Sequence, residues 1–274
     1  MTRATLSEVL TPALREGYAV VGFVCLGWED TRAYLRAAEA EGRPVILQVG
    51  PGARAHMPLS VWAEMLKVLA DEASVPVVSH LDHGMTVADC EEAIALGFTS
   101  VMFDGSGLPL AENIATTKHV AALAHAKGIS CEGEIGYVGY ASGAKSEGTD
   151  PEEAARFAAE TGVDAMAVSI GNVHLQEGQN ASIDQTRLDA IEALTRTPLV
   201  IHGGSGIPSA ERRRLALHSN ICKFNIGTEL RQVFGRALRA KLDAEPLLFD
   251  RIDILSAVEA PLEQAARRVL RELG

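Results

Sequence analysis

The chain alternates short β-rich runs with longer amphipathic segments from one end to the other. Eight runs rich in β-branched and other apolar residues lie at 18–25, 44–49, 76–81, 100–103, 129–134, 165–170, 198–202 and 221–226. Helical patterns separate these runs and follow the last one, at 31–40, 59–71, 87–96, 111–126, 151–161, 183–193, 209–218 and 228–241. Eight strands that are each followed by a helix predict a parallel (β/α)₈ barrel rather than an open sheet.

The length of the chain agrees with this architecture. A chain of 274 residues is close to the size typical of such a barrel, and 47% hydrophobic residues are ample for its core. Two more helical patterns, at 6–16 and 257–272, predict an extra helix at each end. No Ser/Pro-rich linker divides the chain, so we expect a single barrel domain over residues 1–274. The segment 136–148 is long and irregular for a strand-to-helix connection, and in a barrel it would overhang the active-site face.

Charge and cysteine usage exclude several classes of protein. The net charge of −11 argues against a nucleic-acid partner, because such proteins need a basic surface. The four cysteines (Cys25, Cys90, Cys131, Cys222) form no CxxC pair, which predicts reduced and mostly buried thiols. The first residues lack the pattern of a signal peptide, and no apolar stretch approaches the length of a membrane span. We therefore expect a cytoplasmic protein without a membrane partner.

Three histidines lie at or after the ends of three predicted strands: His83 in VVSHLDHG, His174 in VSIGNVHL and His202 in PLVIHGGSG. The carboxyl ends of parallel strands meet at one face of the sheet, and a catalytic zinc ion typically uses three protein ligands. One such histidine is most simply a hydrogen-bonded polar residue, but three together favour a shared metal ion. His80 is a competing position, although strand alternation places it on the opposite face from His83.

Carboxylates lie at the ends of the third, fourth and fifth predicted strands. Asp82, beside His83, either caps the next helix or acts as a general acid and base near the metal. Asp104 ends the fourth predicted strand, and Glu132 and Glu134 share one side of the fifth. These three acids form either a structural layer of ion pairs or an alternative metal site that supports the first.

Two glycine-rich segments follow the last two predicted strands, at 202–208 (HGGSGIP) and 225–228 (NIGT). Barrels often bind phosphate with these two loops, and glycines let the backbone approach an anion closely. The sequence therefore predicts a phosphate site beside the candidate metal. A zinc ion that polarises a substrate carbonyl as a Lewis acid would replace a lysine that activates the carbonyl as a Schiff base. Lys223 is the only lysine at a predicted strand end.

In their order and spacing, the segments LDHG, FDGSG…EN, EGEIG, IGNVH, HGGSGIP and NIGTEL resemble the class II, zinc-dependent aldolases of fructose and tagatose bisphosphates. The resemblance runs from about Leu6 to the final helix. It implies a (β/α)₈ barrel that cleaves a phosphorylated ketose into dihydroxyacetone phosphate and an aldehyde. It also implies that zinc stabilises an enediolate during the reaction.

Carried over by position, the resemblance also assigns the site residues. It makes His83, His174 and His202 the ligands of one catalytic zinc ion, and Asp82 the acid and base at the hydroxyl of the bond being broken. It places a second metal position at Asp104 and Glu134. It implies that the substrate is held by Gly203, Ser205, Gly227 and Thr228 at the phosphate and by Asn225 at the ketone or enediolate end. Members commonly form dimers or tetramers, and the segment 231–242 (RQVFGRALRAKL) is a candidate interface.

The chain departs from the family pattern at positions that bear on catalysis. Leu175 stands where a glycine usually follows the second zinc histidine. Ser142 falls at the expected loop glutamate, which leaves Glu147 as the nearest loop acid and the candidate catalytic residue. Gly227 stands where fructose-type members usually carry aspartate, so the triplet that begins at Asn225 resembles tagatose-type and deoxyketose-type members more closely.

Three functions are therefore open. The first is a zinc-dependent aldolase acting on a phosphorylated ketose or a close relative. The second is a zinc-dependent barrel lyase or isomerase with a different substrate, phosphorylated or not, which Leu175 and Ser142 favour. The third is a catalytically inactive binding protein on an aldolase scaffold, which the retention of three histidines and Asp82 disfavours. Histidine-rich sites also accept Co²⁺, Ni²⁺ or Mn²⁺, so the physiological metal is open as well.

Overall fold

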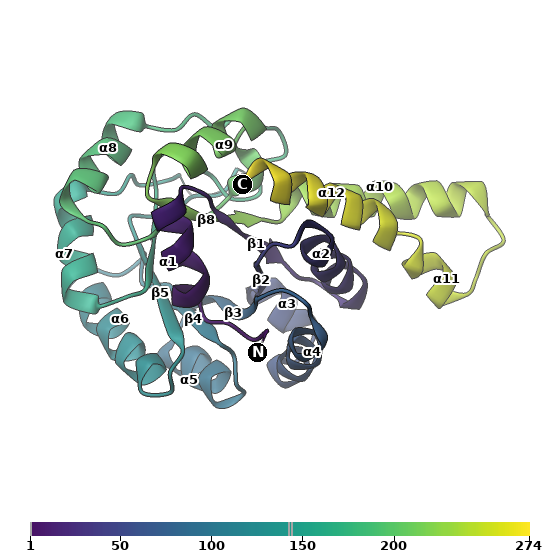
Figure 1. The fold of residues 1–274 in the computed structure, drawn as a ribbon, viewed down its shortest axis with the longest axis horizontal. Helices are drawn as coiled ribbons and strands as arrows, with labels where there is room; N and C mark the ends of the chain where they lie inside the picture. Colours follow the sequence, from purple (N-terminus) through teal and green to yellow (C-terminus); the bar gives the residue numbers. More distant parts are fainter. Residues whose placement is uncertain (1, 142, 144) are drawn as a thin grey trace.

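A computed structural model of the chain describes residues 2–141, 143 and 145–274. Its eight strands form a closed parallel barrel in the order β1 to β8, with β8 paired to β1 (Figure 1). The prediction of a (β/α)₈ barrel is confirmed. The strands are β1 (Val20–Val24), β2 (Val45–Val49), β3 (Val77–Gly84), β4 (Ser100–Phe103), β5 (Ser130–Ile135), β6 (Ala165–Val168), β7 (Leu199–Ile201) and β8 (Ile221–Ile226).

Helices connect consecutive strands around the barrel, and others precede β1 or follow β8. They are α1 (Leu6–Glu16), α2 (Trp28–Glu41), α3 (Pro51–His56), α4 (Leu59–Glu72), α5 (Val87–Ala95), α6 (Leu110–His125), α7 (Pro151–Thr161), α8 (Gln185–Leu194), α9 (Ser209–His218), α10 (Thr228–Ala244), α11 (Arg251–Ser256) and α12 (Glu259–Glu272), with a 3₁₀ turn η1 (Gly204–Gly206) after β7. The sequence did not predict α3 and α11. A helix of six residues completes fewer than two turns, which is too short to show a helical period.

Local chemistry fixes several helix boundaries. Helix α1 begins with a capping box in which Thr5 and Glu8 bond each other's backbone, and it ends at Gly17 in a left-handed conformation. Helix α7 begins at a proline after Asp150, whose carboxylate accepts hydrogen bonds from the backbone N–H groups of Glu152 and Glu153. These caps supply partners for N–H groups that the first turn cannot satisfy internally.

The apolar core forms two clusters, and neither fills the carboxyl end of the barrel interior, where the polar residues lie. The larger cluster lies between the outside of the barrel and the surrounding helices, and it includes the fully buried Trp62 and Phe157. The smaller cluster packs Leu6 and Leu10 of α1 against Val20 and other residues near the amino ends of the strands. Helix α1 therefore closes the amino end of the barrel, and the polar groups described below lie toward the carboxyl end.

Helices α10 and α11 extend away from the barrel as an arm, and α12 returns along α10 to pack on α2 (Figure 1). The turn between α10 and α11 exposes Leu247 and Phe249, each 93% accessible, and Ile252 is 77% accessible. Among the described residues, no helix has both the length and the apolar character needed to cross a membrane.

Candidate active site

The structure brings His83, His174 and His202 together at the carboxyl ends of the strands. Their ring centroids are 5.2 Å apart for His83 and His174, 4.7 Å for His83 and His202, and 5.6 Å for His174 and His202. One nitrogen from each ring lies within 4.8 Å of the others, in a grouping that could hold a metal ion. Residues separated by 119 positions in the sequence thus face one point, as the predicted strand ends required.

The backbone is distorted where it delivers these side chains. The pairing of β3 with β4 shifts register between Leu81 and Gly84, and His83 adopts a φ of 50°. Leu175, directly after His174, has a φ of 56°. These are the two non-glycine residues with positive φ in the described chain, and such a conformation costs about 1–2 kcal/mol for an L-residue. Backbone strain is therefore concentrated beside the candidate metal ligands, as is common at functional sites.

His174 is held by two loops rather than by a strand. Its backbone N–H donates to the carbonyl of Gly139 (2.8 Å), and its carbonyl accepts from the N–H of Ala141 (3.0 Å). The ring of Tyr140 stacks on the imidazole of His174 at a centroid distance of 5.0 Å. The loop after β5 therefore positions one of the three histidines.

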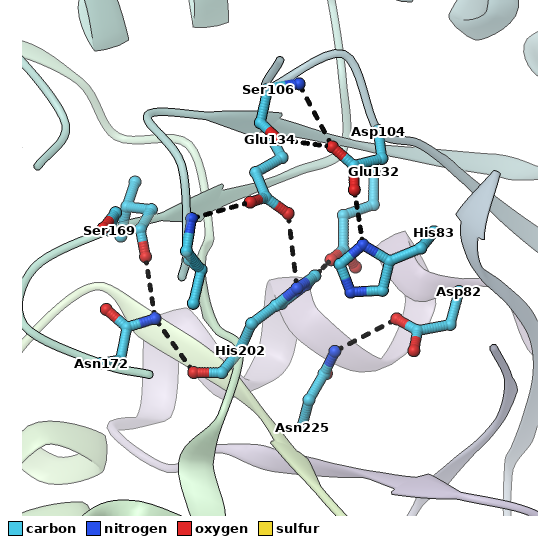
Figure 2. Close-up of polar contacts among 12 residues, drawn as sticks. Asp82, His83, Asp104, Ser106, Glu132, Glu134, Ser169, Asn172, His202 and Asn225 are labelled. Carbon is cyan, nitrogen blue, oxygen red and sulfur yellow. Dashed lines mark hydrogen bonds and ion pairs between the residues drawn. The ribbon is translucent and has the colours of Figure 1, made fainter. Parts of the chain in front are cut away.

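In His83 and His202, the two histidines at strand ends, one ring nitrogen is hydrogen-bonded and the other is available to a metal ion. The Nδ1 of His83 lies 2.7 Å from Asp104 Oδ2, and Asp104 Oδ1 accepts from the Ser106 hydroxyl at 2.7 Å (Figure 2). The Nε2 of His202 lies 3.0 Å from Glu132 Oε1, whereas its Nδ1 is buried without a hydrogen-bond partner. An unpartnered buried nitrogen that faces two other imidazoles fits a metal ligand, and imidazole suits zinc. The residues present therefore fit a zinc ion.

A second grouping lies directly beside the first. Ligand atoms of His83, Asp104 and Glu134 also come within 4.8 Å of one another. The Oε2 atom of Glu134 is buried without a hydrogen bond and lies 3.4 Å from His202 Nδ1. Burial raises the pKa of Glu134 to about 7. Because both groupings use His83, they describe two neighbouring positions for an ion rather than two independent sites.

The histidines differ in charge when no metal is bound. Burial lowers the pKa of His83, but Asp82 and the hydrogen-bonded Asp104 outweigh it and raise the pKa to about 10. Burial and the neighbouring His202 and His83 lower the pKa of His174 to about 3. His83 therefore carries a proton at neutral pH, and metal binding at its free nitrogen must release that proton.

Asp82 is a buried carboxylate at the edge of the same site. The amide Nδ2 of Asn225 donates a hydrogen bond to Asp82 Oδ1 at 3.3 Å (Figure 2). Burial raises the pKa of Asp82, but electrostatic interactions with His83 and His202 outweigh it and hold the pKa below its usual value. Asp82 is therefore ionised at neutral pH and able to accept a proton.

A cavity of about 260 Å³ opens over these residues. Besides Asp82, His83 and His174, its lining includes the predicted substrate-binding residues Gly203, Ser205, Asn225, Gly227 and Thr228. Ser205 Oγ accepts a hydrogen bond from the Gly227 N–H at 3.1 Å, which leaves the hydroxyl proton free to bind an anion. Thr228 begins α10, whose first-turn N–H groups favour negative charge.

Two backbone features shape the anion-binding side of the cavity. Gly203 has a φ of 66°, and a Cβ there would lie 2.2 Å from the carbonyl oxygen of Val173. Only glycine therefore lets η1 pack this closely against the loop that carries His174. Leu175 replaces the glycine of the family pattern but keeps a glycine-like left-handed backbone, and its side chain, 46% exposed, lines the cavity.

Glu147, the loop acid predicted from the sequence to be catalytic, does not line the cavity. Glu147 pairs through its backbone with Tyr137, at 2.8 and 3.0 Å, and its side chain is exposed. Glu147 is not among the residues that line the cavity, whereas Tyr140 of the same loop is. Ser142 lies outside the described residues. The catalytic role of Glu147 stays a prediction, because the structure does not bring its carboxylate to the cavity.

The structure adds cavity residues that the sequence reasoning missed. Gln48 on β2 is fully buried and lines the cavity, and both polar atoms of its amide lack a hydrogen-bond partner. Arg231 on α10 also lines the cavity and forms no ion pair within the described residues. A polar residue inside an apolar strand was a usable signal for Gln48. No comparable signal marked Arg231, because an arginine on a helix is usually solvated.

Comparisons with known proteins agree along the whole chain. A family model described as fructose-bisphosphate aldolase class-II matches residues 4–274. A fructose-bisphosphate aldolase of Geobacillus stearothermophilus is 37% identical over 281 residues, which cover 100% of this chain and 98% of the relative. A 6-phospho-5-dehydro-2-deoxy-D-gluconate aldolase of Shouchella clausii is 35% identical over 275 residues, covering 98% and 94%. The crystal structure of the YdjI aldolase from Escherichia coli K12 matches with a TM-score of 0.86 and 29% identity, covering 99% and 97%.

These proteins share a chemical class but differ in the substrates that their names give. All are aldolases, and the matches extend over almost the full length of each chain. The resemblance inferred from the strand-end motifs is confirmed. The chain belongs to the class-II fructose-bisphosphate aldolase family, and it is a class II aldolase, a lyase of carbon–carbon bonds.

Proposed function

We propose that the protein uses zinc to cleave a phosphorylated ketose into dihydroxyacetone phosphate and an aldehyde. The observation that carries this proposal is the convergence of three imidazoles, His83, His174 and His202, beside the buried carboxylate of Asp82. Zinc held there supplies Lewis-acid stabilisation of the negative charge that develops at the ketone end of the substrate. Asp104 and Glu134 provide a second, adjacent metal position.

Asp82 acts at the bond that breaks. Its ionised carboxylate takes the proton from the hydroxyl group on the carbon that becomes the aldehyde. The electron pair of the carbon–carbon bond then stays with the carbon beside the ketone, which must be protonated to release dihydroxyacetone phosphate. Asn225 holds Asp82 Oδ1, so the second carboxylate oxygen is free to face the substrate.

The phosphate group lies between η1 and the start of α10 in this proposal. The Ser205 hydroxyl and the backbone of Gly203, Gly227 and Thr228 line this part of the cavity, and the Gly227 N–H donates to Ser205 Oγ, which leaves the hydroxyl proton for the anion. Glycine at two of these positions lets an anion contact the backbone directly. Arg231, one helical turn after Thr228, supplies a positive charge that no carboxylate in the described chain neutralises. We therefore assign it to an anionic group of the substrate.

The decisive test requires no assumption about the aldehyde. The zinc-loaded protein is incubated with dihydroxyacetone phosphate in D₂O, and NMR follows the stereospecific loss of one proton from the hydroxyl-bearing carbon. Exchange that a chelator abolishes and added zinc restores is the expected result. Absence of exchange with the metal confirmed present would mean either a different donor substrate or a lost proton shuttle, and would favour a lyase or isomerase that acts on a different substrate.

Gly227 favours one particular substrate within this class. The position usually carries aspartate in fructose-type members, and one relative is named for a phosphorylated keto-deoxy sugar acid. We propose a deoxyketose or tagatose-type substrate over fructose bisphosphate. Measured kcat/KM values for fructose 1,6-bisphosphate, tagatose 1,6-bisphosphate and 6-phospho-5-dehydro-2-deoxy-D-gluconate decide this point, and the highest value for the fructose compound would contradict it.

We also infer a homo-oligomer, either a dimer or a tetramer. The exposed apolar side chains Leu247, Phe249 and Ile252 lie at the tip of the arm formed by α10 and α11, and the segment 231–242 forms much of α10. Burying such side chains against a second copy would stabilise the assembly. Light scattering on the wild type and on a variant with Leu247→Asp and Phe249→Asp tests this, and a monomeric wild type would contradict it.

Two remaining expectations have structural support. All four cysteines are buried and free, as expected for reduced thiols in a cytoplasmic protein. Helices α1 and α12, at opposite ends of the chain, both pack on the barrel, which supports a single folding unit over residues 1–274. One cooperative unfolding transition of the full chain is the corresponding measurement.

A further inference from the structure

Beneath the three histidines, polar side chains from four strands form one connected network inside the barrel. Lys223 Nζ lies 2.6 Å from Glu132 Oε2 and 3.4 Å from His80 Nε2, and His80 Nδ1 lies 2.8 Å from the Ser100 hydroxyl. All four residues are completely buried. Burial and Lys223 lower the pKa of His80 to about 3, so its neutral ring donates to Ser100 and accepts from Lys223.

Burying this network inside the barrel carries a cost in free energy. Removing a lysine and a glutamate from water costs several kcal/mol per ion, and well-packed apolar residues of similar volume are often at least as stable. The pair of Lys223 and Glu132 therefore has no clear advantage for stability alone. Its contact with the site above indicates another role, because the second carboxylate oxygen of Glu132, Oε1, lies 3.0 Å from His202 Nε2 (Figure 2).

The donor and acceptor chemistry of this contact selects one form of the His202 ring. An ammonium group can only donate, and both oxygens of an ionised carboxylate can only accept. With Glu132 Oε2 accepting from Lys223, Oε1 is left to accept from His202, so the Nε2 of His202 must carry the hydrogen. The Nδ1 atom, which is buried without a hydrogen bond and lies 3.4 Å from Glu134 Oε2 on the side of the second metal position, then keeps its lone pair.

We propose that Glu132 and Lys223 are positioning residues for the metal: Lys223 fixes the carboxylate of Glu132, and Glu132 holds His202 in the tautomer whose Nδ1 binds the ion. Hydrogen bonds from metal-binding histidines to carboxylates are a general means of orienting the ring and fixing its tautomer. The inference rests on the proposed ligation of zinc by His202.

The variant Glu132→Gln should invert this arrangement. Lys223 would donate a hydrogen bond to the amide oxygen, so the amide NH₂ would point toward His202 Nε2. Because Nε2 must then accept, the hydrogen of the neutral His202 ring would lie on Nδ1. We expect zinc to bind about 10- to 100-fold more weakly, the range typical when such a supporting contact is lost. Adding Lys223→Met removes the ammonium, so the amide can rotate and present its oxygen to His202 again. The double variant should therefore bind zinc more tightly than E132Q alone, which a purely structural role would not produce.

The measurement is the Zn²⁺ dissociation constant, obtained by competition with a chromophoric chelator for the wild type, E132Q, K223M and the double variant. Co²⁺ absorption spectra report the ligand geometry independently of activity. Glu259→Gln is the matched control, because Glu259 is another buried glutamate but pairs with Arg32 and Arg36 on the outside of the barrel. Wild-type affinity in E132Q, or a double variant no tighter than E132Q, overturns the inference. A wild type that binds no metal would instead reject the proposed function.

A measurement on the unaltered protein covers the case in which E132Q does not fold. The wild type is labelled with ¹⁵N at histidine and loaded with ¹¹³Cd²⁺, so that one-bond coupling identifies the nitrogen that binds the metal. Coupling to Nδ1 of His202, with the hydrogen on Nε2, is the expected result. Coupling to Nε2 of His202 would overturn the inference.

Discussion

The strand ends and the loop after β5 present very different groups around the candidate active site. At the strand ends, Asp82 and His202 are buried, and each is hydrogen-bonded to a polar side chain from another strand. In the loop, Glu147 is exposed, and Tyr140 is 43% accessible. Groups whose charge and orientation depend on burial thus lie on the rigid scaffold, whereas the loop presents groups that remain accessible to solvent.

His174 joins the two regions. It lies six residues after the end of β6, and its backbone forms hydrogen bonds with Gly139 and Ala141 of the loop. Its ring packs near the rings of His83 and His202. A change in the loop can therefore reach the metal site through this residue. Variants confined to either region should show whether metal binding belongs to the strand ends and proton transfer to the loop.

The largest effect should follow loss of a strand-end ligand. His202→Ala removes one of three imidazoles, and we expect kcat to fall at least 10³-fold, because metal stabilisation of several kcal/mol corresponds to about three powers of ten. Zinc content, measured by atomic emission after dialysis, should fall in parallel. The control is His125→Ala, since His125 is an exposed histidine that pairs with Asp164. Normal zinc content with lost activity would remove His202 from the ligand set.

Asp82→Asn should separate proton transfer from metal binding within the strand-end region. The amide cannot accept the hydroxyl proton, so we expect kcat to fall by roughly 10²- to 10³-fold while zinc affinity changes little. Cleavage is measured by coupled detection of dihydroxyacetone phosphate, and zinc affinity by chelator competition. An equal loss of zinc affinity would show that Asp82 acts as a metal ligand rather than as a base.

The loop contains two candidates for proton transfer at the carbon beside the ketone. Burial raises the pKa of Tyr140, so its hydroxyl is neutral and able to donate, and Tyr140 lines the cavity. We expect Tyr140→Phe to lower proton exchange of dihydroxyacetone phosphate in D₂O roughly 10²-fold, and Glu147→Gln to change it less than about threefold. The reverse result would restore Glu147 as the catalytic acid and require the loop to rearrange when substrate binds.

Arg231 lies on α10, outside both regions. Replacing it tests whether a positive charge near the start of α10 contributes to substrate binding. Hydrogen bonds to charged groups contribute about 1.5–3 kcal/mol, so Arg231→Met should lower kcat/KM by about 10- to 100-fold, mainly through KM. Arg239→Met, an exposed arginine farther along the same helix, is the matched control. An unchanged KM for every phosphorylated substrate would show that Arg231 does not contact the substrate.

The strand-end region was more predictable from sequence than the loop, for a physical reason. The barrel follows from alternating periods, and its parallel strands bring their carboxyl ends to one face, so His83, His202 and Asp82 could be placed together. Strand alternation alone did not predict the bulge that turns His83 toward the site, because bulges depend on pairing between strands.

Long-range contacts account for what the sequence did not provide. Glu132 was recognised only as a member of a carboxylate pair, because its contacts with Lys223 and His202 join residues 70 or more positions apart. Glu147 was chosen by counting along an irregular loop, where spacing says little about direction. Arg231 carried no pattern that separates a cavity residue from a solvated helix face. Regular elements project side chains predictably, and loops do not.

The smallest effect should follow Leu175→Gly at the boundary between the loops. Leu175 already adopts a φ of 56°, so glycine restores the residue of the family pattern without changing the backbone path. Relief of about 1–2 kcal/mol of strain is partly offset by the greater freedom of glycine in the unfolded chain, about 0.4–1 kcal/mol, so stability should rise by no more than about 1.6 kcal/mol. If the backbone alone binds phosphate there, kcat/KM measured with the preferred substrate should stay within about threefold. A tenfold or larger increase would show instead that the leucine side chain, at the rim of the cavity, restricts which substrates enter.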